Sequence, residues 1–189
     1  MSTTVAIIGA GPLGRWLALA AARAGFRVLL EDVMPNNLHH AQEMLRQELS
    51  PAGSGPESEA LTKVAFVATI EDAVRQADLI IDCVPDELES KLEIFWLLDR
   101  MAPPRTVFAT PTMRQSIVDL ANCTYRPTQC IAMIAEAKTL TGNSATGTEI
   151  LLRTTPQTAD ETVALVRGFW ERLGFKPRFE LEAAKAKSA

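Results

Sequence analysis

A glycine-rich turn near the start of the chain separates a strand pattern from a helix pattern. The apolar run over residues 5–8 is followed by Gly-Ala-Gly-Pro-Leu-Gly over residues 9–14, and residues 15–24 are rich in alanine and leucine. Gly25 ends the helix pattern, and a second strand pattern over residues 27–30 leads to an acidic pair. This order of strand, glycine turn, helix and strand predicts a parallel βαβ unit that binds a dinucleotide.

The three glycines of the turn have separate physical roles. Gly9 permits the tight turn out of the strand, Gly11 lets a pyrophosphate approach the backbone, and Gly14 lets the helix pack closely on the sheet. Unpaired N–H groups and the positive dipole end at the helix N-terminus favour negatively charged phosphates. The turn therefore predicts a pyrophosphate site.

The acidic pair at the end of the second strand indicates which dinucleotide is bound. Asp32 lies 18 residues after Gly14, where the acid that holds the adenosine ribose hydroxyls is expected, and Glu31 is the second candidate. A carboxylate disfavours a 2′-phosphate, and neither Arg nor Lys follows before position 46. We therefore expect NAD rather than NADP. The alternative is a Rossmann-like domain that has lost its ligand.

Size, charge and cysteine content narrow the class of protein. The 189 residues fit one domain over residues 1–181 with a flexible tail at 182–189. A net charge of −4 without a basic cluster argues against a nucleic-acid partner. There is no apolar run of membrane-spanning length and no signal-peptide pattern, so we expect a cytoplasmic protein. Three cysteines without paired spacing predict small core residues and no metal site.

The rest of the chain alternates between strand and helix patterns. The continuous apolar run over residues 79–82 is typical of a central parallel strand. Further strands are expected at 64–68, 106–109, 130–134, 149–153 and 176–179, helices at 36–48, 70–76, 88–101, 117–122 and 159–173, and polar loops at 50–59 and 136–148. The alternation predicts an α/β fold, a single Rossmann-type, doubly wound, mainly parallel sheet.

The segment 77–91 carries a resemblance to a known family. It reads Ala-Asp-Leu-Ile-Ile-Asp-Cys-Val-Pro-Asp-Glu-Leu-Glu-Ser-Lys, followed by Phe95 and by Leu98-Asp99. Together with the glycine turn, residues 103–112, Arg126-Pro127 and residues 156–162, this pattern resembles the L-3-hydroxyacyl-CoA dehydrogenase family over nearly the whole chain. The resemblance implies an NAD-dependent oxidoreductase of fatty acid metabolism whose N-terminal domain has the Rossmann fold.

The resemblance also implies cofactor contacts and partners. The acid and lysine with which the family contacts the nicotinamide-side ribose match Asp86 and Lys91, for which an ordinary exposed pair at a helix start is the alternative. The full set of predicted cofactor residues is Gly9, Gly11, Pro12, Leu13, Gly14, Asp32, Val84, Pro85, Asp86 and Lys91. The chain ends where the family begins its C-terminal domain. We therefore expect a homo-oligomer such as a dimer, or a partner protein that supplies a substrate domain.

At the catalytic positions the chain departs from the family. Two adjacent serines of the family correspond to Met113 and Arg114, and its catalytic histidine corresponds to Ile134. Isoleucine cannot act as a general base. The two histidines of the chain, His39 and His40, are expected on a solvated helix. The catalytic residues are therefore unknown from the sequence.

A polar segment near the expected nicotinamide site offers other acid–base groups. Its polar side chains are Glu136, Lys138, Thr139, Thr141, Asn143 and Ser144. A glutamate or lysine there can act as a base if burial adjusts its pKa, and the alternative is a polar loop that covers a crevice. Glu149 is the acid nearest to the position of the glutamate that orients the family's histidine.

These observations leave three functions open. The first is an NAD(H)-binding protein without the family's activity, which works with a redox partner or uses NAD as a structural or sensory ligand. The second is a self-contained NAD-dependent oxidoreductase that acts on a 3-hydroxyacyl-CoA-like substrate with a relocated base. The third is a scaffold or interaction module with an empty nucleotide cleft.

Overall fold

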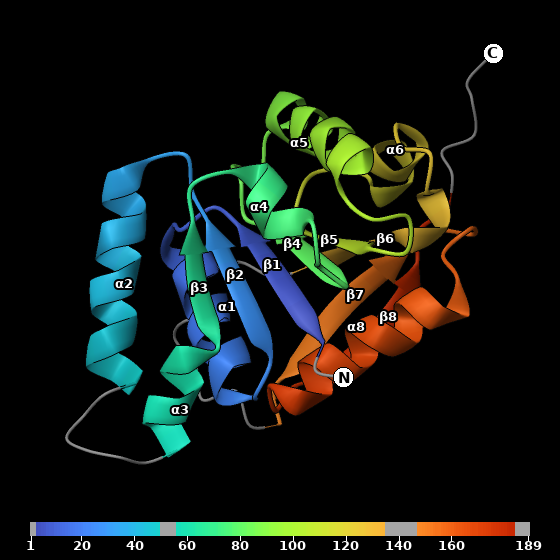
Figure 1. Cartoon of the computed structure of the whole chain (residues 1–189). Helices are drawn as coiled ribbons and strands as arrows, with labels where there is room; N and C mark the ends of the chain where they lie inside the picture. Colours follow the sequence, from blue (N-terminus) through green and yellow to red (C-terminus); the bar gives the residue numbers. More distant parts are fainter. Residues whose placement is uncertain (1–2, 50–55, 135–146, 184–189) are drawn as a thin grey trace.

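The computed structural model describes residues 3–49, 56–134 and 147–183, which form one sheet with helices on both faces. The strands are β1 (Thr4–Ile8), β2 (Arg27–Glu31), β3 (Val64–Val67), β4 (Leu79–Asp82), β5 (Val107–Pro111), β6 (Cys130–Ile134), β7 (Glu149–Thr154) and β8 (Lys176–Leu181). Their order is β3-β2-β1-β4-β5-β6-β7-β8 (Figure 1). Strands β1 to β6 run parallel, whereas β7 is antiparallel to β6 and β8 is parallel to β7. The predicted doubly wound, mainly parallel sheet is confirmed.

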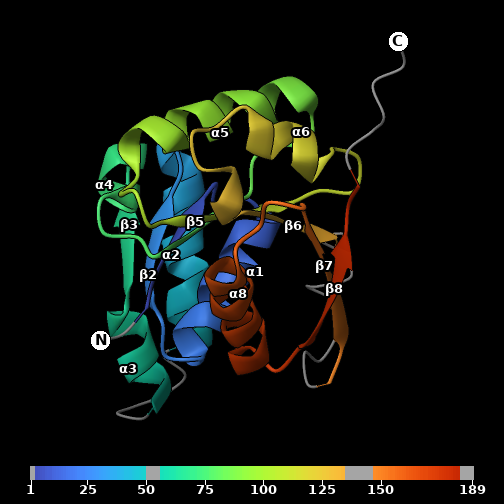
Figure 2. The same ribbon diagram turned by 90° about the vertical axis from the view of Figure 1, so that its right-hand side faces the viewer.

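Two layers of helices cover the sheet. The helices are α1 (Pro12–Arg23), α2 (Pro35–Leu49), α3 (Pro56–Thr62), α4 (Ile70–Val74), α5 (Leu88–Met101), α6 (Ile117–Asn122) and α8 (Asp160–Arg172). Buried residues of α1, α2, α3 and α8 pack in one hydrophobic cluster, and those of α4, α5 and α6 pack in the other. Figure 2 shows the sheet between these two layers.

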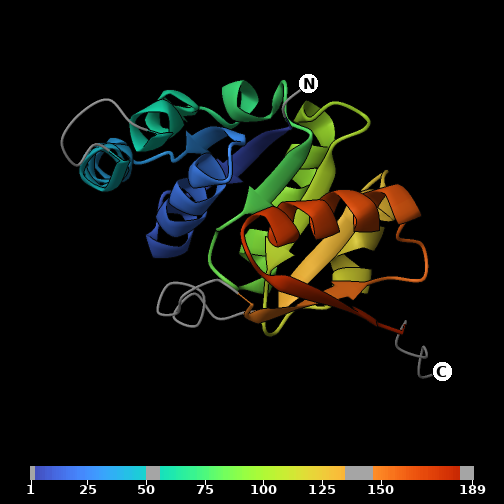
Figure 3. The same cartoon turned by 90° about the horizontal axis from the view of Figure 1, so that it is seen from below.

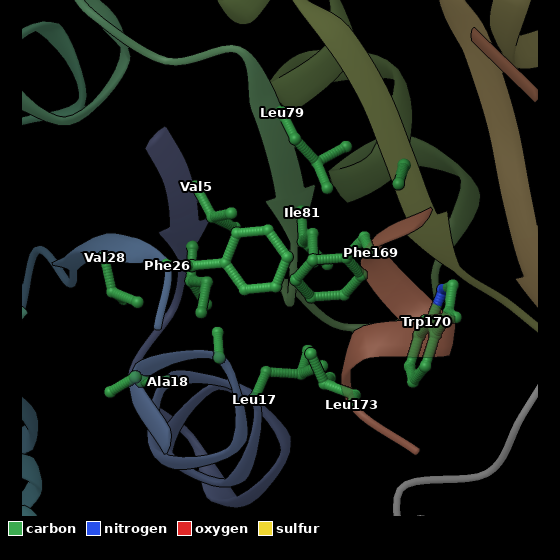
Figure 4. Packing of buried hydrophobic residues seen from close by; sticks show 14 of the residues in the cluster. Val5, Leu17, Ala18, Phe26, Val28, Leu79, Ile81, Phe169, Trp170 and Leu173 are labelled. Carbon is green, nitrogen blue, oxygen red and sulfur yellow. The ribbon is translucent and has the colours of Figure 1, made fainter. Parts of the chain in front are cut away.

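The larger cluster holds α1 and α8 against the strands. Leu17 of α1, Ile81 of β4 and the rings of Phe169 and Trp170 of α8 are buried in this cluster, and Phe169 lies next to Ile81 (Figure 4). The ring of Trp170 meets those of Phe169 and Phe175 edge to face, with centroid distances of 5.4 and 5.1 Å. Edge-to-face aromatic pairs stabilise a core beyond their buried area. This packing fixes α1, and therefore the glycine turn before it, relative to the sheet.

The C-terminal strand pair completes the sheet and ties down the chain beyond it. In Figure 3, α8 (orange) lies across the strands of this half. After β8, the N–H of Glu182 donates to the carbonyl of Thr154, and its carboxylate accepts a hydrogen bond from Ser116 and pairs with Arg153. The predicted flexible tail begins at residue 182, but Glu182 itself is held in place. Residues 184–189 of that tail lie outside the described residues.

Several element boundaries differ from those predicted. The segment 50–59 is not all loop, because α3 begins at Pro56, and proline is favoured in the first helical turn. Helix α1 begins three residues earlier than predicted, at Pro12, for the same reason. Helix α4 ends at Val74, and β5 extends to Pro111. Residues 50–55 of the segment 50–59 lie outside the described residues. Among the helices that the structure describes, none has the length and apolar character of a membrane span.

Candidate functional site

A cavity of about 470 Å³ lies at the carboxyl ends of β1, β2 and β4. Ligands of this fold bind at the carboxyl ends of the strands. Five of the predicted cofactor residues line the cavity: Gly9, Gly11, Asp32, Val84 and Pro85. Pro12, Leu13 and Gly14 form the first turn of α1 beside them. The structure thus brings together residues that lie as far apart in the sequence as Gly9 and Pro85.

The glycine turn has the geometry that a phosphate needs. Gly9 has a φ of 103°, which favours glycine, and its N–H donates to the carbonyl of Glu31 at 2.8 Å. Gly11 is the N-cap of α1 without a side-chain cap, and a Cβ placed on it would meet no atom within 4 Å. A Cβ on Gly14 would lie 1.8 Å from the carbonyl oxygen of Gly9. Gly14 therefore allows α1 to pack closely against the glycine turn, and the open space next to Gly11 can hold an anion at the helix N-terminus.

Asp32 joins three parts of the cavity wall. Its Oδ2 accepts the N–H of Ala10 at 2.8 Å, and its Oδ1 accepts the N–H of Met34 at 2.8 Å. The side-chain amide of Asn37 contacts both oxygens, at 3.1 and 3.2 Å. These bonds connect the glycine turn, the end of β2 and the start of α2. They fix a carboxylate where the sequence predicts the ribose hydroxyls.

Glu31 lines the same cavity from the last position of β2. Its side chain is buried, with the residue 4% exposed. Burial, and then the charge of Asp32, raise the pKa of Glu31 from 4.5 to about 7. The sequence analysis predicted Glu31 as the second candidate after Asp32, and both acids line the cavity in the structure.

The loop after β4 forms another part of the wall. Val84 and Pro85 line the cavity with Cys83, and burial raises the pKa of the Cys83 thiol, which keeps the thiol neutral. Asp86 contacts the loop after β5, where it accepts hydrogen bonds from the hydroxyl of Thr112 and, at 2.9 Å, from the N–H of Met113. Asp86 therefore fastens the loop after β4 to the loop after β5.

Lys91 forms a buried ion pair between α5 and β4. Its Nζ lies 2.6 Å from Oδ1 of Asp82, with side chains 0% and 1% exposed. Burial raises the pKa of Asp82, and the ammonium of Lys91 opposes that effect. The alternative interpretation, an exposed Asp86–Lys91 pair, is wrong for Lys91. This residue lies on the face of α5 that packs against the sheet, and its side chain is buried. Its contact with a nicotinamide-side ribose stays a prediction.

The position that corresponds to the family's histidine carries no base. Ile134 ends β6 and is half-buried. Glu149 is exposed and pairs with Arg178 of β8 at 2.9 Å. The histidines at 39–40 lie on the exposed side of α2. The polar segment 136–144 lies outside the described residues, so its part in catalysis stays a prediction.

The Rossmann sheet, the glycine turn at the N-terminus of α1 and the carboxylate at the end of β2 define a dinucleotide-binding domain. The family described as "3-hydroxyacyl-CoA dehydrogenase, NAD binding domain" matches residues 4–135. The chain belongs to this family, and its cofactor is NAD. The resemblance inferred from the sequence is confirmed.

Individual relatives agree with this assignment. A probable 3-hydroxybutyryl-CoA dehydrogenase of Bacillus subtilis is 32% identical over 135 residues, which cover 68% of this chain and 47% of the relative. A 5-formyl-3-hydroxy-2-methylpyridine 4-carboxylate 5-dehydrogenase of Mesorhizobium japonicum is 28% identical over 188 residues, 94% of this chain and 57% of the relative. The chain thus spans about half the length of the curated relatives it matches.

Solved structures share the fold. A diketoreductase structure is 27% identical with a TM-score of 0.81, over 98% of this chain and 66% of that one. The 3-hydroxybutyryl-CoA dehydrogenase of Escherichia coli K12 has a TM-score of 0.83 at 24% identity, over 96% of this chain and 38% of that one. The alignment over nearly the whole chain includes the antiparallel β7, which lies beyond the segment that the family matches.

Proposed function

We propose that this chain binds NAD(H) in the cavity at β1, β2 and β4 and does not by itself oxidise a 3-hydroxyacyl-CoA. Ile134, at the position that corresponds to the family's histidine, carries the second part of the proposal. Oxidation of a hydroxyl needs a base within hydrogen-bond reach of its proton. An alkyl side chain at the end of β6 cannot accept that proton.

In this proposal NAD(H) serves a substrate site that lies outside the 189 residues. A second copy of the chain, or another protein, supplies the wall facing the nicotinamide. The support is that Ile134, at the end of β6, offers no base to a substrate hydroxyl. The relatives named as dehydrogenases are about one and a half to one and three quarters times as long as this chain. We expect the purified protein to be a dimer by mass in solution. A monomer that stays monomeric with NADH would exclude the second copy and leave a different partner.

Titration with NADH and NADPH tests the cofactor site. We expect NADH to bind at least about tenfold more tightly, since Asp32 repels a 2′-phosphate at the ribose. Tryptophan quenching and energy transfer to the reduced nicotinamide give the two dissociation constants. Failure of both ligands to bind would contradict the proposed function and favour the scaffold hypothesis.

Gly11→Val tests the pyrophosphate position. The valine Cβ meets no protein atom within 4 Å, so the free energy of unfolding should stay within about 0.5 kcal/mol of the wild type. The side chain would occupy the space of the phosphates, and the affinity for NADH should fall at least about tenfold. Calorimetric titration and urea unfolding measure the two effects.

Gly168→Val on α8 is the matched control. A Cβ on Gly168 also meets no atom within 4 Å, and the residue lies outside the cavity. This variant should bind NADH like the wild type. Equal affinity of Gly11→Val and the wild type would place the pyrophosphate elsewhere.

An activity assay separates the proposal from a self-contained dehydrogenase. The NADH-saturated protein should not reduce acetoacetyl-CoA, measured as loss of absorbance at the reduced nicotinamide band. Steady turnover by the pure chain would contradict the proposal and would show that a residue other than Ile134 acts as the general base. The polar segment 136–144 would then be the first place to look for it.

A further inference from the structure

The strongest unexplained feature of the cavity is the Glu31 carboxyl group. Among the described residues it has no hydrogen bond and no ion pair, although the residue is only 4% exposed. Asp32, the next residue, has both oxygens engaged by Ala10, Met34 and Asn37. The side-chain oxygens of Glu31 are not among the fully enclosed polar atoms that lack a partner in the described part of the chain, so they open onto the cavity, where water or a ligand supplies the partner.

The register of the sheet shows which way Glu31 points. In the parallel pairing of β1 with β2, Glu31 lies beside Ile8, and paired residues of parallel strands share a face. Ile8 packs in the cluster of α4 and α5, on the opposite face from α1. Ile70 of α4 and Ile94 of α5 line the same cavity. The Glu31 side chain therefore enters the cavity from the face of the sheet that α4 and α5 cover, between the apolar side chains of Ile70 and Ile94.

This part of the cavity is the place of the nucleotide base. In the proposed NAD(H) site the pyrophosphate lies at the glycine turn and the ribose at Asp32, which leaves the part of the cavity beyond Asp32 for the base. There the lining consists of Val33, Ile70, Val84, Pro85 and Ile94, with Glu31 as the polar group. Apolar walls around one convergent polar group are typical of a site that holds a planar, mostly apolar ligand in one orientation.

Resting on the proposed NAD(H) site, we propose that Glu31 binds the edge of the adenine base and selects adenine. A carboxylic acid offers a donor and an acceptor side by side, as a glutamine amide does. A glutamine amide binds adenine bidentately, with its oxygen accepting from N6–H and its nitrogen donating to N7. The neutral Glu31 acid makes the equivalent pair, in which its carbonyl oxygen accepts from N6–H and its hydroxyl donates to a ring nitrogen.

The charges around Glu31 favour the neutral acid. Burial, and then the neighbouring carboxylate of Asp32, raise the pKa of Glu31 to about 7. The other cavity residue that can ionise, Cys83, is held neutral by burial. The neighbours of Glu31 from β1, β3, α4 and α5 are Ile8, Val67, Ile70 and Ile94, all apolar. The neutral acid also avoids repulsion of the negatively charged pyrophosphate.

Protonation of Glu31 therefore couples NADH affinity to pH. The neutral form binds, so the affinity is constant well below the pKa of the free protein and falls as the pH rises through it. With a pKa of about 7, Glu31 is about 90% neutral at pH 6.0 and roughly 3% neutral at pH 8.5. We expect NADH to bind at least about tenfold more weakly at pH 8.5 than at pH 6.0.

Glu31→Gln and Glu31→Leu separate the charge from the base contact. The glutamine variant keeps the donor and acceptor at all pH values, so it should bind NADH equally at pH 6.0 and 8.5. Glu71→Gln on the exposed face of α4 is the matched control and should keep the pH dependence of the wild type. The exposed His39 and His40 are present in every variant, so the difference between wild type and Glu31→Gln reports Glu31 alone.

The base contact is tested at pH 6.0 with NAD⁺ and nicotinamide 1,N6-ethenoadenine dinucleotide, whose base lacks the N6–H donor. The wild type should favour NAD⁺ by about 5- to 150-fold, and Glu31→Leu should reduce that ratio toward one. An unchanged ratio in Glu31→Leu, or a pH dependence that survives in Glu31→Gln, overturns the role of Glu31 while NADH binding itself stands. Absence of NADH binding by the wild type overturns the proposed function, and the inference with it.

Discussion

Lys91→Met is expected to destabilise the fold by about 3–5 kcal/mol. The substitution leaves Asp82 buried, with a side chain 1% exposed, after its 2.6 Å partner is removed. An uncompensated carboxylate in the interior costs far more than the pair contributes in net stability. Urea unfolding at pH 8 measures the loss. The loss should shrink at lower pH, because burial has raised the pKa of Asp82 and protonation removes the unpaired charge.

The double variant Asp82→Asn/Lys91→Met and the single variant Arg178→Met are the controls. The double variant removes both charges and should recover at least half of the lost stability. Arg178 pairs with Glu149 on the surface, with side chains 60% and 63% exposed, so Arg178→Met should cost less than about 1 kcal/mol. A Lys91→Met protein as stable as Arg178→Met would show that the interior pair does not exist in solution.

Gly14→Ala is expected to cost about 3 kcal/mol or more and to abolish NADH binding. The alanine Cβ would lie 1.8 Å from the carbonyl oxygen of Gly9 and 3.0 Å from its carbonyl carbon. Both atoms belong to the backbone of the turn, so no side chain can move aside. Helix α1 would have to move away from β1, which opens the core around Leu17 and displaces the phosphate site. Thermal unfolding and NADH titration report the two losses.

Gly168→Ala makes the same change in α8, where nothing lies within 4 Å of the new methyl group. Alanine is a better helix former than glycine by about 1 kcal/mol, so this control should be slightly more stable than the wild type. If Gly14→Ala behaves like Gly168→Ala, then α1 does not contact β1 as closely as the structure has it.

Elements with strong local signals could be predicted from the sequence to the residue. The predicted bounds of β4, α5, α6 and β6 are those observed. Continuous apolar runs mark the two strands. Helix α6 begins after Ser116, whose hydroxyl accepts the N–H of Asp119, and Pro103 follows closely on α5. Helix α3 was missed because its proline, serine and threonine content is also that of a loop.

The phosphate and ribose ends of the site could be predicted because one short segment encodes them. Gly9, Gly11 and Asp32 lie within 24 residues and have roles set by backbone geometry. The burial of Lys91 could not be predicted, because it depends on the angle at which α5 packs on β4. The direction of Glu31 depends on the register between β1 and β2. Neither property is a function of local sequence alone.

The hydrogen bonds of Asp32 make cofactor loading an exchange rather than a simple addition. Two backbone N–H groups and the Asn37 amide already occupy the carboxylate, so ribose hydroxyls must replace the longer contacts of Asn37. The released amide nitrogen lies at the start of α2, and its N–H groups would become available to the incoming sugar. Part of the free energy gained from the new bonds would therefore be offset by the loss of the old ones. Asn37 thus gives α2 a direct bond to the carboxylate that the cofactor would occupy.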